Sequence, residues 1–207
     1  MKSLKENKRA FTLIEVMLAV GVIAVTLTAM IGLLAAITSN VNQIRYQTKS
    51  VALLANLETL LKMKSFDTVY KWVANAGEPY VIYFWDEYQN PEDVDNSSLV
   101  TLCSEMNGMT PSNPPTQEHI ENSEGEVYRV FLSLYQAGLK GQKTRINDET
   151  EYSGGSLDGE STSYALSYLP MKVQIMVDPR DDVINGTGDE IINEQRRVYE
   201  DIIVKMR

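Results

Sequence analysis

One carboxylate near the N-terminus lies beside a segment in which charge is costly. Glu15 precedes residues 16–37, a run of 22 residues without a charged side chain. A helix of that length, rising about 1.5 Å per residue, spans the hydrocarbon core of a bilayer. A carboxylate at the centre of a membrane helix costs roughly 2.5 to 3.5 kcal/mol, and less near the interface. We therefore expect Glu15 either to pair with a cation or to lie at headgroup depth.

The residues before Glu15 distinguish this segment from a secretory signal peptide. A basic leader comes first, then the small residue Ala10, then Phe-Thr-Leu-Ile-Glu. A signal peptide has an apolar core of about 7 to 15 residues, and its small-residue cleavage site follows that core. Ala35 and Ala36 could mimic such a late site, but the run before them is long for a signal core. We expect the segment to be retained as a membrane helix.

Residues 8–16, which read KRAFTLIEV, resemble the prepilin-type cleavage and methylation motif of type IV pilins and type II secretion pseudopilins. The resemblance implies that prepilin peptidase cuts between Ala10 and Phe11 and that the new Phe11 amine is methylated. Glu15 then becomes the fifth residue of the mature chain, and in a filament it can neutralise the Phe11 amine of a neighbouring subunit. The family most often has Gly before the cut, so Ala10 departs from its pattern.

The same resemblance implies a set of partners and a location. The partners are other pilin or pseudopilin subunits, an inner-membrane assembly platform and a separate ATPase. The protein would cross the inner membrane once, with a periplasmic C-terminal domain, before it joins a pilus or pseudopilus. The positive-inside rule gives the same orientation, because residues 1–10 carry four basic side chains and residues 38–44 carry no charge.

A second candidate site is the acidic loop DPRDDVINGTGDE near the C-terminus. Its oxygen-bearing side chains are those of Asp178, Asp181, Asp182, Asn185, Asp189 and Glu190. Calcium prefers such oxygen ligands, and some pseudopilins bind calcium in a C-terminal loop. The spacing does not match an EF-hand, so a solvated acidic loop is the favoured interpretation and calcium the alternative. We expect no other cofactor.

The sequence gives little support to catalysis or to nucleic-acid binding. His119 is the single histidine, residues 138–144 (GLKGQKT) lack phosphate-loop spacing, and no nucleophile and base set is visible. The net charge is −9, and removing residues 1–10, which carry a net +3, leaves −12. Such an acidic chain is poorly suited to binding phosphates directly. Cys103 is the only cysteine, so no internal disulfide can form.

The spacing of apolar residues predicts the elements that hold these groups. No Gly or Pro occurs between Gly32 and Gly77, and apolar residues continue at helical spacing after the span, at Val41, Ile44, Val51, Leu54, Leu57 and Leu61. We expect one helix over residues 11–63. A short helix is expected at 66–73, and strands at 80–85, 99–103, 127–135, 164–177 with a break at Pro170, and 198–206. Residues 86–98 and 104–125 are expected to be loops, and residues 136–163 a surface insertion.

These elements predict an α+β fold with a long N-terminal helix on a C-terminal antiparallel sheet, the ladle that the pilin resemblance also implies. The domains expected are a leader at 1–10, a helix at 11–64 whose transmembrane half is 16–37, and a globular domain at 65–207. Three functions stay open. The first is a minor pilin or pseudopilin, the second is a membrane-anchored binding or sensor module that forms no filament, and the third, least favoured, is a tethered hydrolase.

Overall fold

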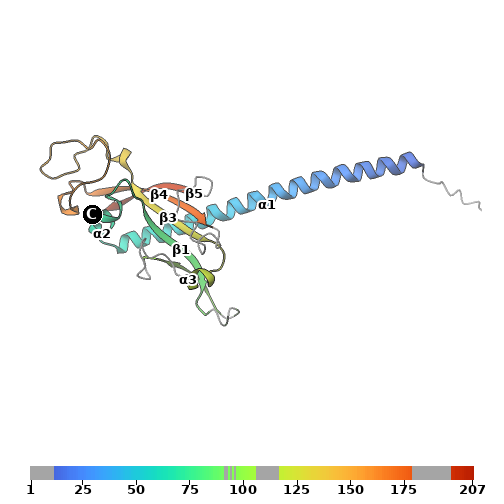
Figure 1. Ribbon diagram of the computed structural model, residues 1–207, viewed down its shortest axis with the longest axis horizontal. Helices are drawn as coiled ribbons and strands as arrows, with labels where there is room; N and C mark the ends of the chain where they lie inside the picture. Colours follow the sequence, from blue (N-terminus) through green and yellow to red (C-terminus); the bar gives the residue numbers. More distant parts are fainter. Residues whose placement is uncertain (1–11, 91–92, 94, 96, 106–116, 179–196) are drawn as a thin grey trace, which may run out of the picture. The chain divides into compact units, whose positions relative to one another are not determined.

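The computed structural model describes residues 12–90, 93, 95, 97–105, 117–178 and 197–207. By its internal contacts the chain divides into two compact units, Met1–Arg45 and Tyr46–Arg207. Helix α1 (Leu13–Met63) passes through the boundary between the two units as one continuous element (Figure 1). The long helix expected from the apolar spacing is confirmed from Leu13 onward.

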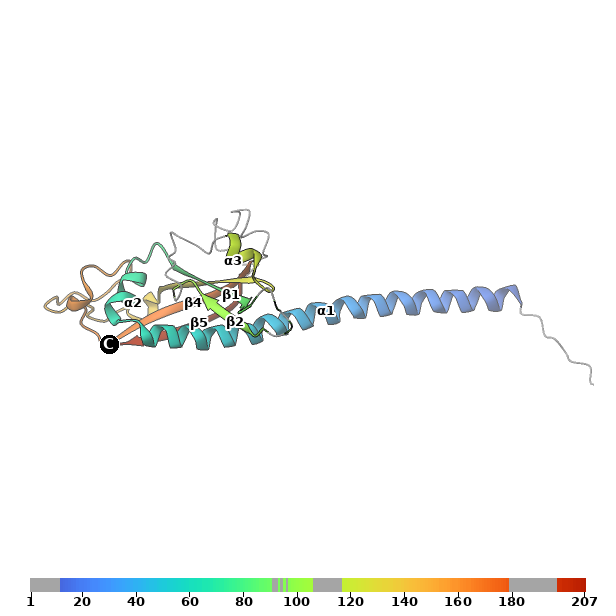
Figure 2. The ribbon, with the colours of Figure 1, turned by 90° about the horizontal axis from the view of Figure 1, so that it is seen from below.

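The second unit contains a five-stranded antiparallel sheet (Figure 2). Its strands are β1 (Tyr80–Tyr88), β2 (Leu99–Cys103), β3 (Val127–Leu134), β4 (Tyr168–Asp178) and β5 (Arg197–Met206), in the order β2-β1-β3-β4-β5. Each neighbouring pair is antiparallel. The predicted α+β class is therefore confirmed, and β2 and β5 form the two edges of the sheet.

The core of the second unit lies between one face of this sheet and the C-terminal part of α1. The helix contributes Leu53 and Leu57, both with 0% exposure, one turn apart on the same face. The sheet contributes fully buried residues at alternating positions: Ile82, Val130, Leu132, Val173 and Ile175. Helical spacing on α1 and strand alternation on the sheet thus supply two apolar surfaces that bury each other.

Strand β4 runs through Pro170 without the predicted break. The carbonyl of Pro170 accepts a hydrogen bond from the Tyr135 N–H at 3.0 Å, so the backbone of Pro170 faces the β3 side of β4. Strand β3 ends at Leu134, one residue before this point. The missing N–H of the proline therefore falls just beyond the end of β3, where no ladder bond is lost.

Two further predictions need correction. Strand β1 extends to Tyr88, although residues 86–88 are predicted to be loop, because they pair with β2. Short helix α3 (Gln117–Glu121) likewise occupies part of a predicted loop. The predicted short helix is confirmed as α2 (Phe66–Val73), which begins where the Ser65 hydroxyl accepts a hydrogen bond from the Thr68 N–H at 3.1 Å.

The predicted surface insertion over residues 136–163 is partly buried. It includes the 3₁₀ helices η2 (Gln136–Gly138) and η3 (Ser161–Ser163). Leu139, Tyr152 and Leu157 are 0%, 8% and 7% exposed and belong to the core. These three residues are too far apart in the sequence to show a helix or strand period. Their burial could therefore not be predicted from the spacing of apolar residues.

Candidate functional site

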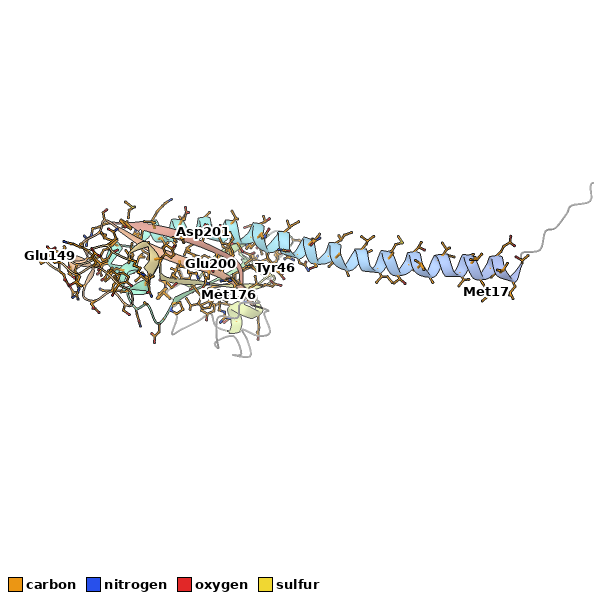
Figure 3. All side chains as sticks on the ribbon, turned by 90° about the horizontal axis from the view of Figure 1, so that it is seen from above. Met17, Tyr46, Glu149, Met176, Glu200 and Asp201 are labelled. Carbon is orange, nitrogen blue, oxygen red and sulfur yellow. The ribbon has the colours of Figure 1, made fainter. Side chains whose placement is uncertain are left out.

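The first half of α1 presents apolar side chains on all sides. Every large apolar side chain from Leu13 to Ile44 is between 49% and 80% exposed. Figure 3 shows the side chains of this segment, Met17 among them, extending from the helix in all directions. An exposed apolar surface of this extent is found where a membrane or a protein partner covers it. Among the described residues, α1 is the one helix long and apolar enough to cross a membrane.

Three threonines in this segment are compatible with a hydrocarbon environment. The hydroxyls of Thr26, Thr28 and Thr38 donate to carbonyls one turn earlier, with distances of 2.9 to 3.0 Å to Val22, Ala24 and Leu34. Their polar groups are thus satisfied within the helix itself and need no water.

Glu15 lies at the start of α1 and forms a capping box with Thr12. The Thr12 N–H and the Thr12 hydroxyl each donate to Glu15 Oε2 at 2.9 Å. The Glu15 N–H approaches the Thr12 Oγ1 in return at 3.4 Å. This reciprocal arrangement satisfies donors that would otherwise be unpaired at the helix N-terminus. Glu15 therefore has a local partner that does not depend on any second chain.

Thr12 is the residue that the sequence-based reasoning missed. The signal was present as Thr-Leu-Ile-Glu, a threonine followed three residues later by glutamate just before an apolar run. The two residues proposed for processing, Ala10 and Phe11, lie outside the described residues. The structure thus brings Glu15 together with Thr12 and does not bear on the cleavage site.

The proposed calcium ligands fall largely outside the described part of the chain. Asp181, Asp182, Asn185, Asp189 and Glu190 all lie there. Asp178 is the last residue of β4, and its backbone pairs with Val127 of β3. Within the residues that the structure describes, no group of three or more His, Cys, Asp or Glu side chains could hold a metal ion.

Polar contacts fix the first turns of α1 within the second unit. The Lys49 ammonium contacts both carboxylate oxygens of Asp86, at 2.6 and 2.7 Å, and the Thr101 hydroxyl at 3.2 Å. The Tyr46 hydroxyl, from the residue labelled in Figure 3, donates to Glu126 Oε1 at 2.8 Å. The Lys49 and Asp86 side chains are only 25% and 18% exposed, so this ion pair is partly shielded from water.

A lysine from the last strand holds the other end of α1. The Lys205 ammonium donates to the carbonyls of Leu61 at 2.6 Å and Lys64 at 2.8 Å. These carbonyls lie at the helix C-terminus, where they lack intrahelical partners and where the helix dipole favours a cation. Strand β5 and α1 are therefore joined by a charge-assisted contact as well as by apolar packing.

Lys205→Met should lower the free energy of unfolding by about 1 to 3 kcal/mol, because it removes two hydrogen bonds donated by a charged group and also removes the cation at the helix end. Lys62→Met is the matched control, since Lys62 belongs to the same final turn but its side chain is exposed. We expect the control to change stability by less than about 0.5 kcal/mol. Urea denaturation of the full chain in detergent measures both, and equal effects would contradict the capping role.

Lys64 also belongs to an aromatic cluster that follows α1. Its ammonium lies 5.8 Å from the ring centroid of Trp72 and 3.3 Å from Glu105 Oε2. The Trp72 and Tyr80 rings stack with their centroids 4.5 Å apart. Burial and the hydrogen bond to Glu105 raise the pKa of Tyr80, so its hydroxyl stays protonated and donates. This cluster holds the turn after α1 against the sheet.

His119 contacts two residues of β1. Its ring centroid lies 5.6 Å from that of Trp85, and its Nδ1 lies 3.7 Å from Glu87 Oε2. The indole N–H of Trp85 also donates to Glu87 Oε2, at 3.2 Å. The side chain of His119 is 34% exposed, so it is a half-buried packing residue of α3 on the sheet.

The chain thus joins an exposed apolar helix, which begins with the Thr12–Glu15 capping box, to a sheet domain stabilised by polar contacts such as that between Lys49 and Asp86. No protein-family model matches this chain, and neither the curated proteins nor the solved structures provide a match.

Proposed function

We propose that the protein is a pilin-like structural subunit, a minor pilin or pseudopilin, that waits in the inner membrane and joins a helical filament through the first half of α1. Prepilin peptidase would cut between Ala10 and Phe11, the Phe11 amine would be methylated, and Glu15 would neutralise that amine on a neighbouring subunit. An assembly platform and a separate ATPase would drive growth. The domain after the span would face the periplasm.

One observation carries this proposal: the apolar surface of α1 between Leu13 and Ile44 is exposed all round. A surface of that kind is stable in lipid and also against other apolar helices, and a filament subunit must occupy both environments in turn. The KRAFTLIEV motif at residues 8–16 supports the same conclusion. The acidic sheet domain supplies a water-soluble body of its own, with a separate core.

The capping box favours a second candidate, a single-pass anchored binding or sensor module. Because Thr12 satisfies the Glu15 carboxylate within the same chain, the acid has a role without any neighbouring subunit. In this case the apolar helix would remain in the membrane permanently. The leader would stay attached, and the protein would form no filament.

Intact-mass measurement separates the two candidates. The full chain and the variant Ala10→Leu are each co-expressed with a prepilin peptidase and extracted from membranes. Their intact masses are then measured by mass spectrometry. We expect the wild type to begin at methylated Phe11 and the variant to keep its leader, because leucine replaces the small residue before the cut. An unprocessed wild type in cells where a known prepilin is cleaved would reject the filament candidate.

A further inference from the structure

In the part of the chain that the structure describes, nothing pairs with the outer edge of β5 along the last residues of the strand. The Arg207 N–H donates to the Ser167 carbonyl at 2.9 Å, so these two residues turn their backbone groups toward each other. In an antiparallel ladder the direction alternates at each residue. The backbone groups of Ile202, Val204 and Met206 therefore point away from β4. Among the described residues, no strand pairs with this side of β5.

The side chains at the same three positions are apolar and exposed. Ile202, Val204 and Met206 are 47%, 51% and 62% exposed, whereas Ile203 between them is 9% exposed. Natural edge strands usually avoid such a combination of free backbone and apolar surface, because it promotes pairing with another chain. Part of the edge is protected, since the Ile202 N–H donates to Asp201 Oδ1 at 2.7 Å. The open donors are therefore those of Val204 and Met206.

A groove of about 530 Å³ lies beside this edge, between β5 and α1. Its α1 wall is formed by Glu58, Leu61 and Lys62. The charged residues of the β5 wall are already engaged: Lys205 binds the end of α1, and Asp201 accepts from Tyr199 and from the Ile202 N–H. Earlier on β5, Glu200 is held by Gln174 and Lys172, which lower the pKa of its carboxyl. Figure 3 labels Glu200 and Asp201 on this strand.

The charges on the α1 wall indicate what kind of strand fits. Glu58 and Lys62 are exposed and one helical turn apart, a rise of about 6 Å. Two residues of a β-strand cover about 6.8 Å. A base and an acid at alternate positions of an incoming strand can therefore face Glu58 and Lys62 together. The residue between them, and its neighbours on that face, would extend the apolar row of β5.

We propose that the β5 edge docks an extended segment of a partner protein, antiparallel to β5, with apolar residues on one face and an acid followed two residues later by a base on the other. The order of the acid and the base follows from the direction in which the partner segment runs relative to α1. Strand β5 runs the same way as α1, since Lys205, near the end of β5, contacts the C-terminal end of α1. An antiparallel segment passes Lys62 before Glu58, so its acid comes first.

This proposal goes beyond filament assembly and does not depend on it. The apolar half of α1 and the β5 edge belong to different units of the chain. Either surface can bind without the other, so the failure of one proposal leaves the other untouched.

The test uses the peptide Thr-Val-Glu-Val-Lys-Val-Thr and the full chain in detergent micelles. Amide hydrogen exchange measured by NMR should slow by at least about tenfold at Val204 and Met206 when the peptide saturates the protein, because their N–H groups become hydrogen-bonded to the peptide. The control peptide Thr-Val-Lys-Val-Glu-Val-Thr has the same composition and should protect these amides less. Equal protection by both peptides, or none by either, would overturn the proposal.

Three further variants test where and how the peptide binds. Val204→Pro removes an outward N–H without touching the ladder to β4, and it should abolish protection at Met206; Leu99→Pro, on the opposite edge of the sheet, should leave it unchanged. Combining Glu58→Lys with Lys62→Glu should reverse the preference between the two peptides. Protection that rises with protein concentration in the absence of peptide would show that a second copy occupies the edge, and would replace the proposed partner.

Discussion

In the proposed filament, replacing Glu15 by glutamine should strongly reduce incorporation of the subunit while leaving the helix intact. Glutamine can keep the capping box, because its side-chain oxygen still accepts from the N–H and hydroxyl of Thr12. It cannot neutralise the Phe11 amine of a neighbouring subunit. Removing one partner of a buried ion pair costs about 3 to 5 kcal/mol, so incorporation should fall by at least about tenfold. The measurement is the fraction of tagged protein recovered in sheared filaments from native cells.

Thr12→Ala is the matched control for this prediction. It removes the capping hydroxyl but leaves the Glu15 charge, and loss of such a cap costs only about 1 kcal/mol. The filament candidate therefore expects Glu15→Gln to be the more severe change. The anchored-module candidate expects both variants to stay in the membrane like the wild type. In that case Thr12→Ala, which loses the cap, should be the more destabilising of the two. Normal incorporation of Glu15→Gln into filaments would show that the carboxylate serves the cap alone.

The largest expected effect on stability is that of Leu57→Ala. Leu57 has 0% exposure and lies in the core between α1 and the sheet. Truncating a buried leucine costs about 2 to 5 kcal/mol, because it removes apolar contacts and leaves a cavity. For a domain of this size a loss of about 3 kcal/mol lowers the Tm by roughly 6 to 12 °C. Thermal unfolding followed by near-ultraviolet circular dichroism of the full chain in detergent measures the shift.

Val51→Ala provides the comparison on the same helix. Its side chain is 56% exposed, so its truncation should change stability by no more than about 0.5 kcal/mol. The propensity changes of the two substitutions are both below about 1 kcal/mol, so a larger difference between the variants reports the burial of Leu57. Equal shifts for the two variants would mean that the C-terminal part of α1 does not pack on the sheet as the structure shows.

The sequence by itself determined most of the local elements of this protein, although it did not predict α3 or the full length of β1. Helix α1 was readable because its apolar residues recur at helical spacing and no Gly or Pro interrupts it after Gly32. The signal for the capping box was also present, as Thr12 and Glu15 stand three residues apart, although it was not predicted. Both features depend only on contacts within one or two turns of backbone, which a short stretch of sequence specifies completely.

Only the tertiary structure decided which distant groups meet. It placed Pro170 beyond the end of β3, buried Leu139 in the core and brought Lys205 to the end of α1. It also left β5 at an edge of the sheet, with no strand among the described residues paired to its outer side. These outcomes depend on the order in which strands pair and on which loops close, and residues 144 positions apart, such as Lys205 and Leu61, carry no shared local pattern. Strand order is settled by the packing of whole apolar faces, which no short segment of the chain encodes.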